Sequence, residues 1–182
     1  GELNAVPAHI LGISLGGMVA FQLAVDYPDL IRSLIVVNST PSMIPRSIWD
    51  RVSFLRRLLI IRFFGLRKMG QVLADRFFPY PDQDELKEIF IQRWAENDKP
   101  AYLEAMKAVA GWRVQERLTE IQAPTLVLGA DGDYFSLEDK THYTDLIPDA
   151  KLVVIEDSRH ALPAEKPQEF NRIVLDFLGD IT

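Results

Sequence analysis

Short apolar runs, bounded by turn-forming residues, recur along the chain and alternate with stretches of helical periodicity. Four runs have the length of buried strands, and they lie at residues 7–11, 34–37, 125–128 and 151–155. Helical patterns cover residues 18–25, 137–146 and 165–178. Strands that alternate with helices indicate βαβ units, and uninterrupted apolar runs are typical of strands covered on both faces. We therefore predict an α/β fold with a mostly parallel sheet of about four strands, flanked by helices.

Residues 41–122 depart from this alternation of strands and helices, because no strand pattern appears in them. Apolar side chains recur there at helical spacing, first at Ile48, Val52, Leu55 and Leu59. Pro100 suits the first turn of a further helix. We predict that residues 41–122 form an all-helical insertion between two core segments, residues 1–40 and 123–182.

The composition is that of one globular core. Of 182 residues, 48% are hydrophobic and 25% are charged, which argues against disorder and against two separate domains. The chain has no cysteine, so disulfides and thiol nucleophiles are excluded and a reducing, cytoplasmic location is favoured. Three scattered histidines do not suggest a metal site. No uncharged apolar run reaches the length of a transmembrane segment.

The formal net charge of −6 is unevenly distributed. Residues 46–76 contain eight basic and two acidic residues, a net +6, which leaves −12 for the remainder. The acidic total argues against nucleic-acid binding. The basic segment is read as a solvated helix face, with an anionic substrate or an anionic membrane surface as alternatives.

The sequence Gly-Ile-Ser-Leu-Gly, centred on Ser14, lies between a predicted strand and a predicted helix. In this setting a G-x-S-x-G motif is a nucleophile elbow, in which the serine hydroxyl projects above the sheet. We expect Gly12 and Gly16 to let strand and helix approach closely, since a Cβ at either position would clash. The alternative is a glycine-rich turn that merely starts a helix.

A serine hydroxyl needs a base to take its proton, and His160 is the best candidate. It lies in the loop after the last predicted strand and before a helix, where its side chain could reach over the sheet. His9 falls inside a predicted buried strand and is expected to pack in the core. His142 falls in a helix and is expected at the surface. The alternative for His160 is a solvated loop histidine.

The imidazole in turn needs a carboxylate to hold its tautomer. Two aspartates follow the strand at residues 125–128, namely Asp131 and Asp133. We favour Asp133, because the aromatic residues that follow it could shield it from water. Asp131 beside a glycine has the alternative role of forming a turn. The order serine, aspartate, histidine is that of α/β-hydrolase triads.

With these motifs the chain resembles the C-terminal part of α/β-hydrolase-fold proteins, and it is similar to the small bacterial esterase and enol-lactonase branch with a helical cap. The likeness extends from the elbow through Asp133 to the loop at residues 160–167 and the last helix. Arg159 departs from it, because relatives usually carry glycine before the histidine. The resemblance implies that the insertion is a lid over the serine. It also implies that the Leu15 N–H is one oxyanion-hole donor, while the second donor lies upstream of the elbow.

These observations predict a serine hydrolase that cleaves carboxylic esters or related acyl compounds through Ser14, His160 and Asp133, without cofactor or metal. A small hydrophobic or acyl-type substrate is expected, because the insertion offers apolar walls from Trp49, Phe54, Phe63, Phe64, Phe77, Phe78, Trp94 and Trp112. Two alternatives remain. One is a non-catalytic truncated fragment that folds only in an assembly, and the other is a binding module that uses the insertion.

The motif begins at residue 12, whereas such an elbow ordinarily follows several strands. We therefore expect this chain to be the C-terminal portion of a larger fold. The resemblance places the elbow strand in the centre of a complete sheet, so that here it would have an open hydrogen-bonding edge. An open edge favours association, and we predict self-association or pairing with a missing N-terminal half.

Overall fold

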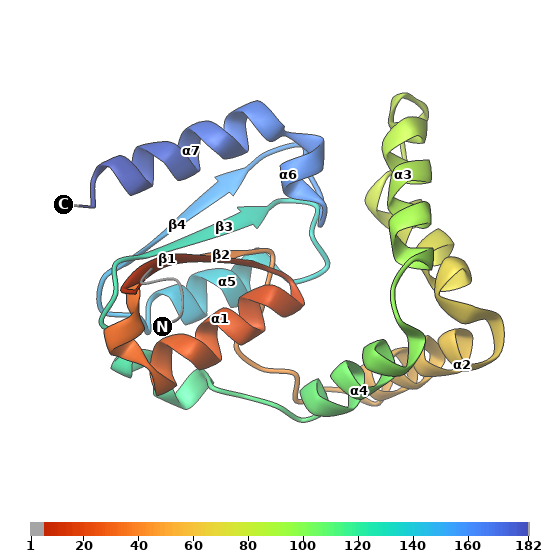
Figure 1. Cartoon of the computed structure of the whole chain (residues 1–182), viewed down its shortest axis with the longest axis horizontal. Coiled ribbons are helices and arrows are strands. Elements are labelled where there is room, and N and C mark those ends of the chain that lie inside the picture. The colour runs from red at the N-terminus through yellow and green to blue at the C-terminus, as the bar shows by residue number, and fades with distance from the viewer. Residues whose placement is uncertain (1–5, 182) are drawn as a thin grey trace. The chain divides into compact units, whose positions relative to one another are not determined.

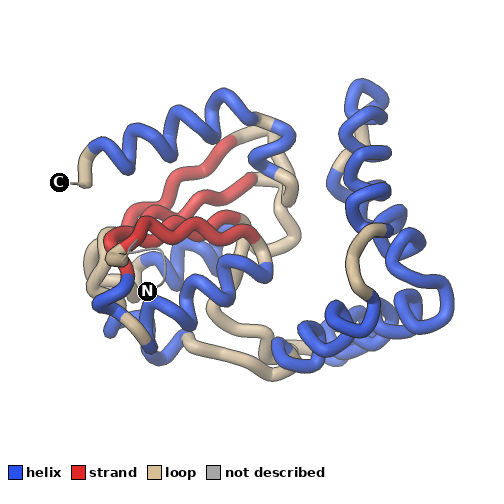
Figure 2. The backbone as a smooth tube through the Cα atoms, viewed as in Figure 1, coloured by secondary structure: helices blue, strands red, loops and turns tan. Residues whose placement is uncertain are grey.

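The computed structural model describes residues 6–181, and its four strands form one parallel sheet (Figures 1 and 2). The strand order is β1-β2-β3-β4, and every neighbouring pair is parallel. The bounds are β1 Ala8–Ile13, β2 Ile31–Val37, β3 Thr125–Ala130 and β4 Ala150–Ile155. Each strand overlaps the apolar run that predicted it, and the predicted parallel α/β fold is confirmed.

The chain divides into two compact units. One unit runs up to Ser42 and resumes at Arg113, and the other spans Met43–Trp112. Besides the sheet, the first unit contains α1 (Leu15–Asp26), η1 (Pro28–Leu30), η3 (Gln115–Glu120), α5 (Leu137–Thr144), α6 (Leu162–Glu165) and α7 (Pro167–Gly179). The second unit is helical, with α2 (Ile48–Phe77), η2 (Pro81–Gln83), α3 (Asp84–Ala95) and α4 (Lys99–Val109).

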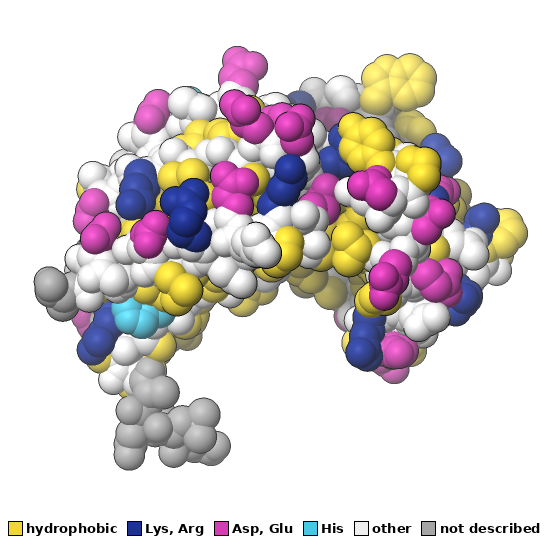
Figure 3. Space-filling model, turned by 90° about the horizontal axis from the view of Figure 1, so that it is seen from above, with side chains coloured by type: hydrophobic (Ala, Val, Ile, Leu, Met, Phe, Trp, Pro, Cys, Tyr) yellow, Lys and Arg dark blue, Asp and Glu magenta, His cyan; other side chains and the backbone are white. Residues whose placement is uncertain are grey.

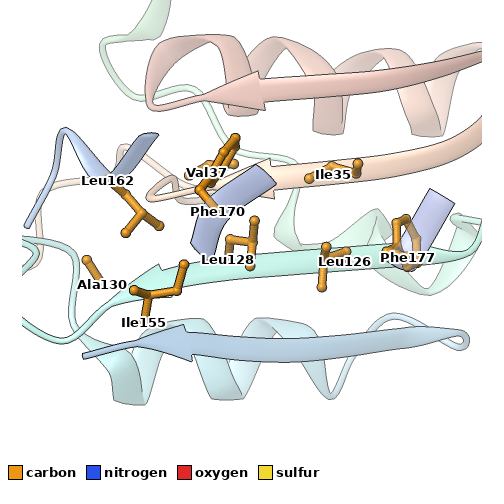
Figure 4. Packing of buried hydrophobic residues seen from close by; sticks show 9 residues of the cluster. All are labelled: Ile35, Val37, Leu126, Leu128, Ala130, Ile155, Leu162, Phe170 and Phe177. Atoms are coloured by element: carbon orange, nitrogen blue, oxygen red, sulfur yellow. The ribbon is translucent and has the colours of Figure 1, made fainter. Parts of the chain in front are cut away.

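Helices cover both faces of the sheet in the first unit (Figure 1). On one face, Phe170 and Phe177 of α7 pack against apolar side chains of β2, β3 and β4 (Figure 4). On the other face lie α1 and α5, where the rings of Phe21 and Tyr143 meet edge to face at 5.5 Å. This two-sided cover explains why β2 and β3 read as continuous apolar runs.

The outward side of α7 is charged, as expected for a surface helix. Glu169, Arg172 and Asp176 are exposed on it. Figure 3 views the molecule from the side on which α7 lies in Figure 1, and basic and acidic side chains are interspersed on that face. The burial of Phe170 and Phe177 against the sheet, not charge pairing, is therefore what places this helix.

Strand β1 is more exposed than its apolar sequence predicts. It pairs with β2 alone among the described residues, and Leu11 and Ile13 are 43% and 38% exposed. The prediction that His9 packs in the core is wrong. Its side chain is exposed, and its Nδ1 lies 2.8 Å from the hydroxyl of Ser33. Side-chain burial depends on neighbours across the sheet, and an edge strand has fewer of them.

In the second unit, α2 is interrupted at Gly65, whose φ of 83° and ψ of 177° are not helical. Glycine adopts this left-handed backbone without a Cβ clash. The unit's core is formed by Ile61, Leu66 and Met69 of α2, which pack against Trp94 and Tyr102 from α3 and α4. The stripe predicted from helical spacing does not join this core, because its four members are exposed, at Ile48, Val52, Leu55 and Leu59.

A half-buried aromatic pair in this unit, Trp94 and Tyr102, contacts the cation of Arg57. The guanidinium of Arg57 lies 5.6 Å from the ring centre of Trp94 and 5.7 Å from that of Tyr102. Its Nε also donates a hydrogen bond of 2.8 Å to the Tyr102 hydroxyl. Such cation–π contacts contribute roughly 0.5–2 kcal/mol. Arg57 therefore ties three helices together and does not belong to the solvated charge of the segment.

Candidate active site

The three residues of the predicted triad all follow strands of the same sheet. Ser14 comes directly after β1, Asp133 lies in the loop after β3, and His160 lies in the loop after β4. Since the strands are parallel, their carboxyl ends share one edge, which is where open α/β sheets bind ligands. The topology thus gathers these residues at the carboxyl ends of the strands, although up to 146 positions of sequence separate them.

Ser14 sits on a strained turn between β1 and α1. Its backbone has φ 53° and ψ −116°, a left-handed conformation that a non-glycine residue adopts only under constraint. The end of β2 supplies that constraint. The Ser14 N–H donates to the carbonyl of Val37 at 3.0 Å, and the Ser14 carbonyl accepts from the Ser39 hydroxyl at 2.6 Å.

The glycines around the turn have different roles. A Cβ on Gly12 would lie 2.2 Å from the carbonyl oxygen of Gly16, so strand and helix approach too closely for a side chain there. The steric argument is wrong for Gly16, because a Cβ at that position would meet nothing within 4 Å. The second close approach is at Gly17 instead, where a Cβ would lie 2.5 Å from the Cβ of Ser39.

Leu15 is the first residue of α1. The N–H groups of a helix's first turn have no acceptor within the helix, and they favour a negative charge in front of them. The Leu15 N–H is therefore chemically suited to an oxyanion next to Ser14, and its role as a donor stays a prediction.

His160 and Asp133 are in direct contact. Nδ1 of His160 lies 2.7 Å from Oδ1 of Asp133. The His160 residue is 7% exposed, and the Asp133 side chain is fully buried. Because an ionised carboxylate only accepts hydrogen bonds, Nδ1 carries the proton and Nε2 is left as the basic nitrogen. This is the tautomer in which an imidazole takes a proton from a serine.

The surroundings of Asp133 favour its ionised form. Burial is the largest influence and raises the pKa of Asp133, but the hydrogen bond and electrostatic influence of His160, together with the charge and hydrogen bond of Lys140, outweigh it. The pKa of Asp133 therefore lies below its ordinary value. The ammonium group of Lys140 lies beside the carboxylate, with its Nζ 2.7 Å from Oδ2, and the carboxylate also accepts the N–H of Tyr134 at 2.8 Å.

Asp131, the alternative acid, has a different set of partners. Its carboxylate accepts the backbone N–H groups of Asp157 and Ser158, both at 3.1 Å. These bonds join the loop after β3 to the loop after β4, and the structure records no hydrogen bond between Asp131 and His160 within residues 6–181. Asp131 thus fixes the spacing of the two loops that carry Asp133 and His160.

The basic nitrogen of His160 faces a tyrosine. The Tyr134 hydroxyl lies 3.1 Å from Nε2, and the two rings are stacked with centres 4.3 Å apart and a tilt of 31°. With Nδ1 protonated, Nε2 accepts this hydrogen bond from the tyrosine. No hydrogen bond joins the Ser14 hydroxyl to His160 in the described part of the chain.

Asn38, directly after β2, links the end of β3 to the loop after β4. Its Nδ2 donates to the carbonyls of Arg159 and His160 at 2.9 and 3.2 Å, and its Oδ1 accepts the N–H of Ala130 at 2.9 Å. Asn38 is fully buried and has a φ of 43°, a conformation that asparagine tolerates better than most residues. The same turn continues into Ser39, which holds the Ser14 carbonyl.

Sequence reasoning missed several of these groups. Asn38 received no role from the sequence, although a polar residue directly after a buried parallel strand lies where open α/β sheets bind ligands. Glu165 was missed as well, and its carboxylate accepts the N–H of Arg159 at 3.1 Å. Burial raises the pKa of Glu165. Arg159 itself has no left-handed backbone, so a residue other than glycine fits there.

Two further properties of residues 6–181 concern cofactors and membranes. No group of three or more histidine, cysteine, aspartate or glutamate side chains in this range is arranged to hold a metal ion. Within the same range, no helix combines the length and the apolar character needed to cross a bilayer.

Comparison with known proteins identifies relatives over nearly the whole chain. The family described as "alpha/beta hydrolase fold" matches residues 2–167. The chain is 30% identical over 185 residues to 2-hydroxy-6-oxo-6-phenylhexa-2,4-dienoate hydrolase of Comamonas testosteroni, covering 94% of this chain and 62% of that protein. It is 29% identical over 177 residues to 3-oxoadipate enol-lactonase 2 of Acinetobacter baylyi, covering 95% and 64%. Both relatives are named as enzymes.

Solved structures show the same fold. The enol-lactonase from Burkholderia xenovorans LB400 superimposes with a TM-score of 0.87 at 20% identity, covering 98% of this chain and 68% of that one. At this identity the likeness concerns the fold alone. The chain thus spans a little under two thirds of the two curated relatives named above, at 62% and 64% of their length.

Proposed function

Because the chain belongs to the alpha/beta hydrolase fold family, we propose that it is a serine hydrolase acting on carboxylic esters or related acyl compounds. Ser14 is the nucleophile, His160 the base and Asp133 the acid of the proposed triad. The observation that carries the proposal is the 2.7 Å hydrogen bond between His160 Nδ1 and Asp133 Oδ1. It lies at the sheet edge where the strained Ser14 turn also lies.

The proposed reaction follows from the tautomer of His160. Nε2 takes the hydroxyl proton of Ser14 as the oxygen attacks the substrate carbonyl carbon, and Asp133 stabilises the imidazolium that forms. The Leu15 N–H donates to the oxyanion. His160 then returns the proton to the leaving group, which leaves an acyl group on Ser14. Water, deprotonated by Nε2, releases the acid and restores the serine.

This sequence requires Nε2 to exchange one hydrogen-bond partner for another. In the structure the partner is the Tyr134 hydroxyl at 3.1 Å, and during attack it must be the Ser14 hydroxyl. A neutral hydrogen bond of this kind contributes roughly 0.5–1.5 kcal/mol, so the exchange is a modest step compared with the chemistry.

The substrate class rests on the second unit. Its exposed aromatic side chains include Trp49, Phe63 and Phe64, and exposed apolar groups mark ligand or partner contacts where they are clustered. We propose a substrate with a hydrophobic acyl or alkyl part. The lid role that the resemblance implies for this unit stays a prediction.

A fluorophosphonate probe tests the proposed nucleophile, because it reacts covalently with activated serines. The account predicts labelling of the wild-type chain and its loss in Ser14→Ala. Ser53→Ala, which removes an exposed serine of α2, is the matched control and should label like the wild type. Well-folded wild-type chain that remains unlabelled would favour the alternative of a non-catalytic fragment.

A second candidate function is binding through α2. On this helix the exposed stripe of Ile48, Val52, Leu55 and Leu59 is flanked by exposed arginines at Arg51, Arg56 and Arg62. An apolar stripe flanked by basic residues is typical of helices that lie on anionic membranes. This arrangement favours an anionic lipid surface over a nucleic acid as the partner.

Vesicle binding distinguishes this candidate. Sedimentation with phosphatidylserine vesicles should carry the chain down, and phosphatidylcholine vesicles should not. Arg51→Glu/Arg56→Glu should abolish the binding, whereas Arg172→Glu on exposed α7 is the control. Vesicle binding that survives Arg51→Glu/Arg56→Glu would count against this candidate function. Arg57 is unsuitable as a test position, because its contacts with Trp94 and Tyr102 are structural.

A further inference from the structure

Lys140 is a fully buried lysine in α5, next to the proposed acid. Its side chain has no exposed surface, and neither has that of Asp133. Lysine is almost never fully buried unless it is paired, and burial lowers the pKa of Lys140. The steps proposed above give this cation no proton to move, so its place beside the triad needs another explanation.

Two short hydrogen bonds fix the ammonium group. Nζ of Lys140 lies 2.7 Å from Oδ2 of Asp133 and 2.6 Å from the carbonyl oxygen of Phe135. The stem of the lysine passes over β3 at Gly129, where an added Cβ would lie only 3.0 Å from Cδ of Lys140. The absence of a side chain at Gly129 therefore makes room for the lysine.

These contacts give the two oxygens of Asp133 different partners. Oδ2 is held by Lys140, and Oδ1 accepts from Nδ1 of His160 at 2.7 Å and from the N–H of Tyr134 at 2.8 Å. A carboxylate fixed at both ends cannot rotate about its Cβ–Cγ bond. The bond from Lys140 to the Phe135 carbonyl restrains the same loop, whose Tyr134 ring stacks on His160.

We propose that Lys140 is a positioning residue for the reaction, holding Asp133 through Oδ2 so that Oδ1 is presented to Nδ1 of His160. This inference rests on the proposed function. The charge of the lysine opposes the stabilisation of an imidazolium by Asp133, so its contribution is orientation of the carboxylate. The site is thus a chain of four side chains, in which Lys140 acts only through Asp133.

Lys140→Met tests the proposal, because methionine has a similar length and lacks the ammonium group. We expect the variant to label with the fluorophosphonate on the order of 10²-fold more slowly than the wild type, the cost typical of a misplaced catalytic group. Lys151→Met, at an exposed lysine of β4, is the control and should label at the wild-type rate. Circular dichroism establishes that each variant is folded.

A proton resonance of His160 gives a readout that does not depend on activity. The proton on Nδ1, held in a short bond to Asp133, resonates at low field in the NMR spectrum. We expect this signal in the wild type and in Ser14→Ala, and its loss or displacement in Lys140→Met. A Lys140→Met protein with the wild-type signal and the wild-type labelling rate would overturn the proposal.

Lys140→Arg covers the case in which the methionine variant does not fold, since it keeps a buried cation. We expect it to retain the Nδ1 proton signal and to label faster than any neutral variant that folds, Lys140→Gln included. A Lys140→Arg protein that labels at the wild-type rate but lacks the Nδ1 proton signal would overturn the proposal. If the wild type itself does not label, the proposed function fails, and the proton signal alone still decides whether Lys140 positions Asp133.

Discussion

Asp133 contributes both to the stability of the first unit and to the chemistry proposed for it. It is buried between a histidine and a lysine, and its pKa lies below the ordinary value of 3.8 because these partners outweigh the effect of burial. A carboxyl group whose pKa is lowered by folding stabilises the fold above its ordinary pKa. This contribution is lost as the pH falls through the pKa of the folded state.

Asp133→Asn should destabilise the protein by about 3–5 kcal/mol at pH 7, because it leaves the Lys140 ammonium buried without its carboxylate. The free energy of unfolding in urea measures this loss. The gap between wild type and variant should narrow below pH 3.8, the ordinary pKa, as the wild-type carboxylate becomes protonated. Asp145→Asn, at an exposed position, serves as the control. A gap that is independent of pH would contradict the assigned ion pair.

Tyr134→Phe isolates the hydroxyl that occupies Nε2 of His160, since the ring stacked on the imidazole is kept. Because Ser14 must replace this hydroxyl, its removal should speed fluorophosphonate labelling roughly 2- to 10-fold, the equivalent of one neutral hydrogen bond. Tyr27→Phe, at an exposed tyrosine, should change nothing. Slower labelling of Tyr134→Phe would show that the hydroxyl assists the reaction instead of competing with the serine.

At the scale of elements, the junction of β1 and α1 is set by backbone contacts. Strand and helix meet at Gly12, and the helix meets the end of β2 at Gly17, where the nearest atoms belong to Ser39. Both contacts lie within a few residues of Ser14, so the turn is held from two sides. The left-handed backbone of Ser14 is the consequence.

Gly17→Ala should therefore destabilise the protein by roughly 1–3 kcal/mol, the usual cost of overpacking. Gly16→Ala is the matched control. A Cβ there meets nothing, and alanine in a helix should stabilise by roughly 0.4–1 kcal/mol. Thermal unfolding of the two variants measures the difference. If Gly16→Ala were the more damaging substitution, the assignment of the close approach to Gly17 would be wrong.

The sequence predicts the elements of the first unit well, because strand and helix periodicities there agree with turn residues. The helix at residues 137–146 is an example, and His142 is exposed on it as expected. The buried lysine of the same helix was missed, since a charged residue in a polar stretch indicates surface. Its spacing from Tyr143, Thr144 and Ile147, all buried, is the helical signal that could have found it.

At the scale of the whole chain, sequence alone fails where burial depends on distant neighbours. The apolar run of β1 predicts a strand covered on both faces, yet Leu11 and Ile13 are exposed on it. The helical stripe beginning at Ile48 is exposed as well. Both patterns fix the type of element correctly, because periodicity is local. Neither pattern contains the information about which other segment lies opposite.

Within residues 6–181, β1 pairs with β2 alone, and such an edge strand predicts association of this polypeptide in solution. Sedimentation velocity should give an average mass that rises with concentration. Leu11→Lys places a charge on the exposed face of the edge strand and should reduce the rise, whereas Leu175→Lys on exposed α7 should not. A monomer at every concentration would contradict the edge argument.

The central claim is that Ser14 carries the acyl group during turnover. The most direct measurement is the mass of the Ser14 peptide after acid quenching of a reaction with p-nitrophenyl acetate. The account predicts an acetyl adduct on Ser14 in the wild type, and neither adduct nor turnover in Ser14→Ala. An adduct on another residue, or turnover that persists in Ser14→Ala, would contradict it.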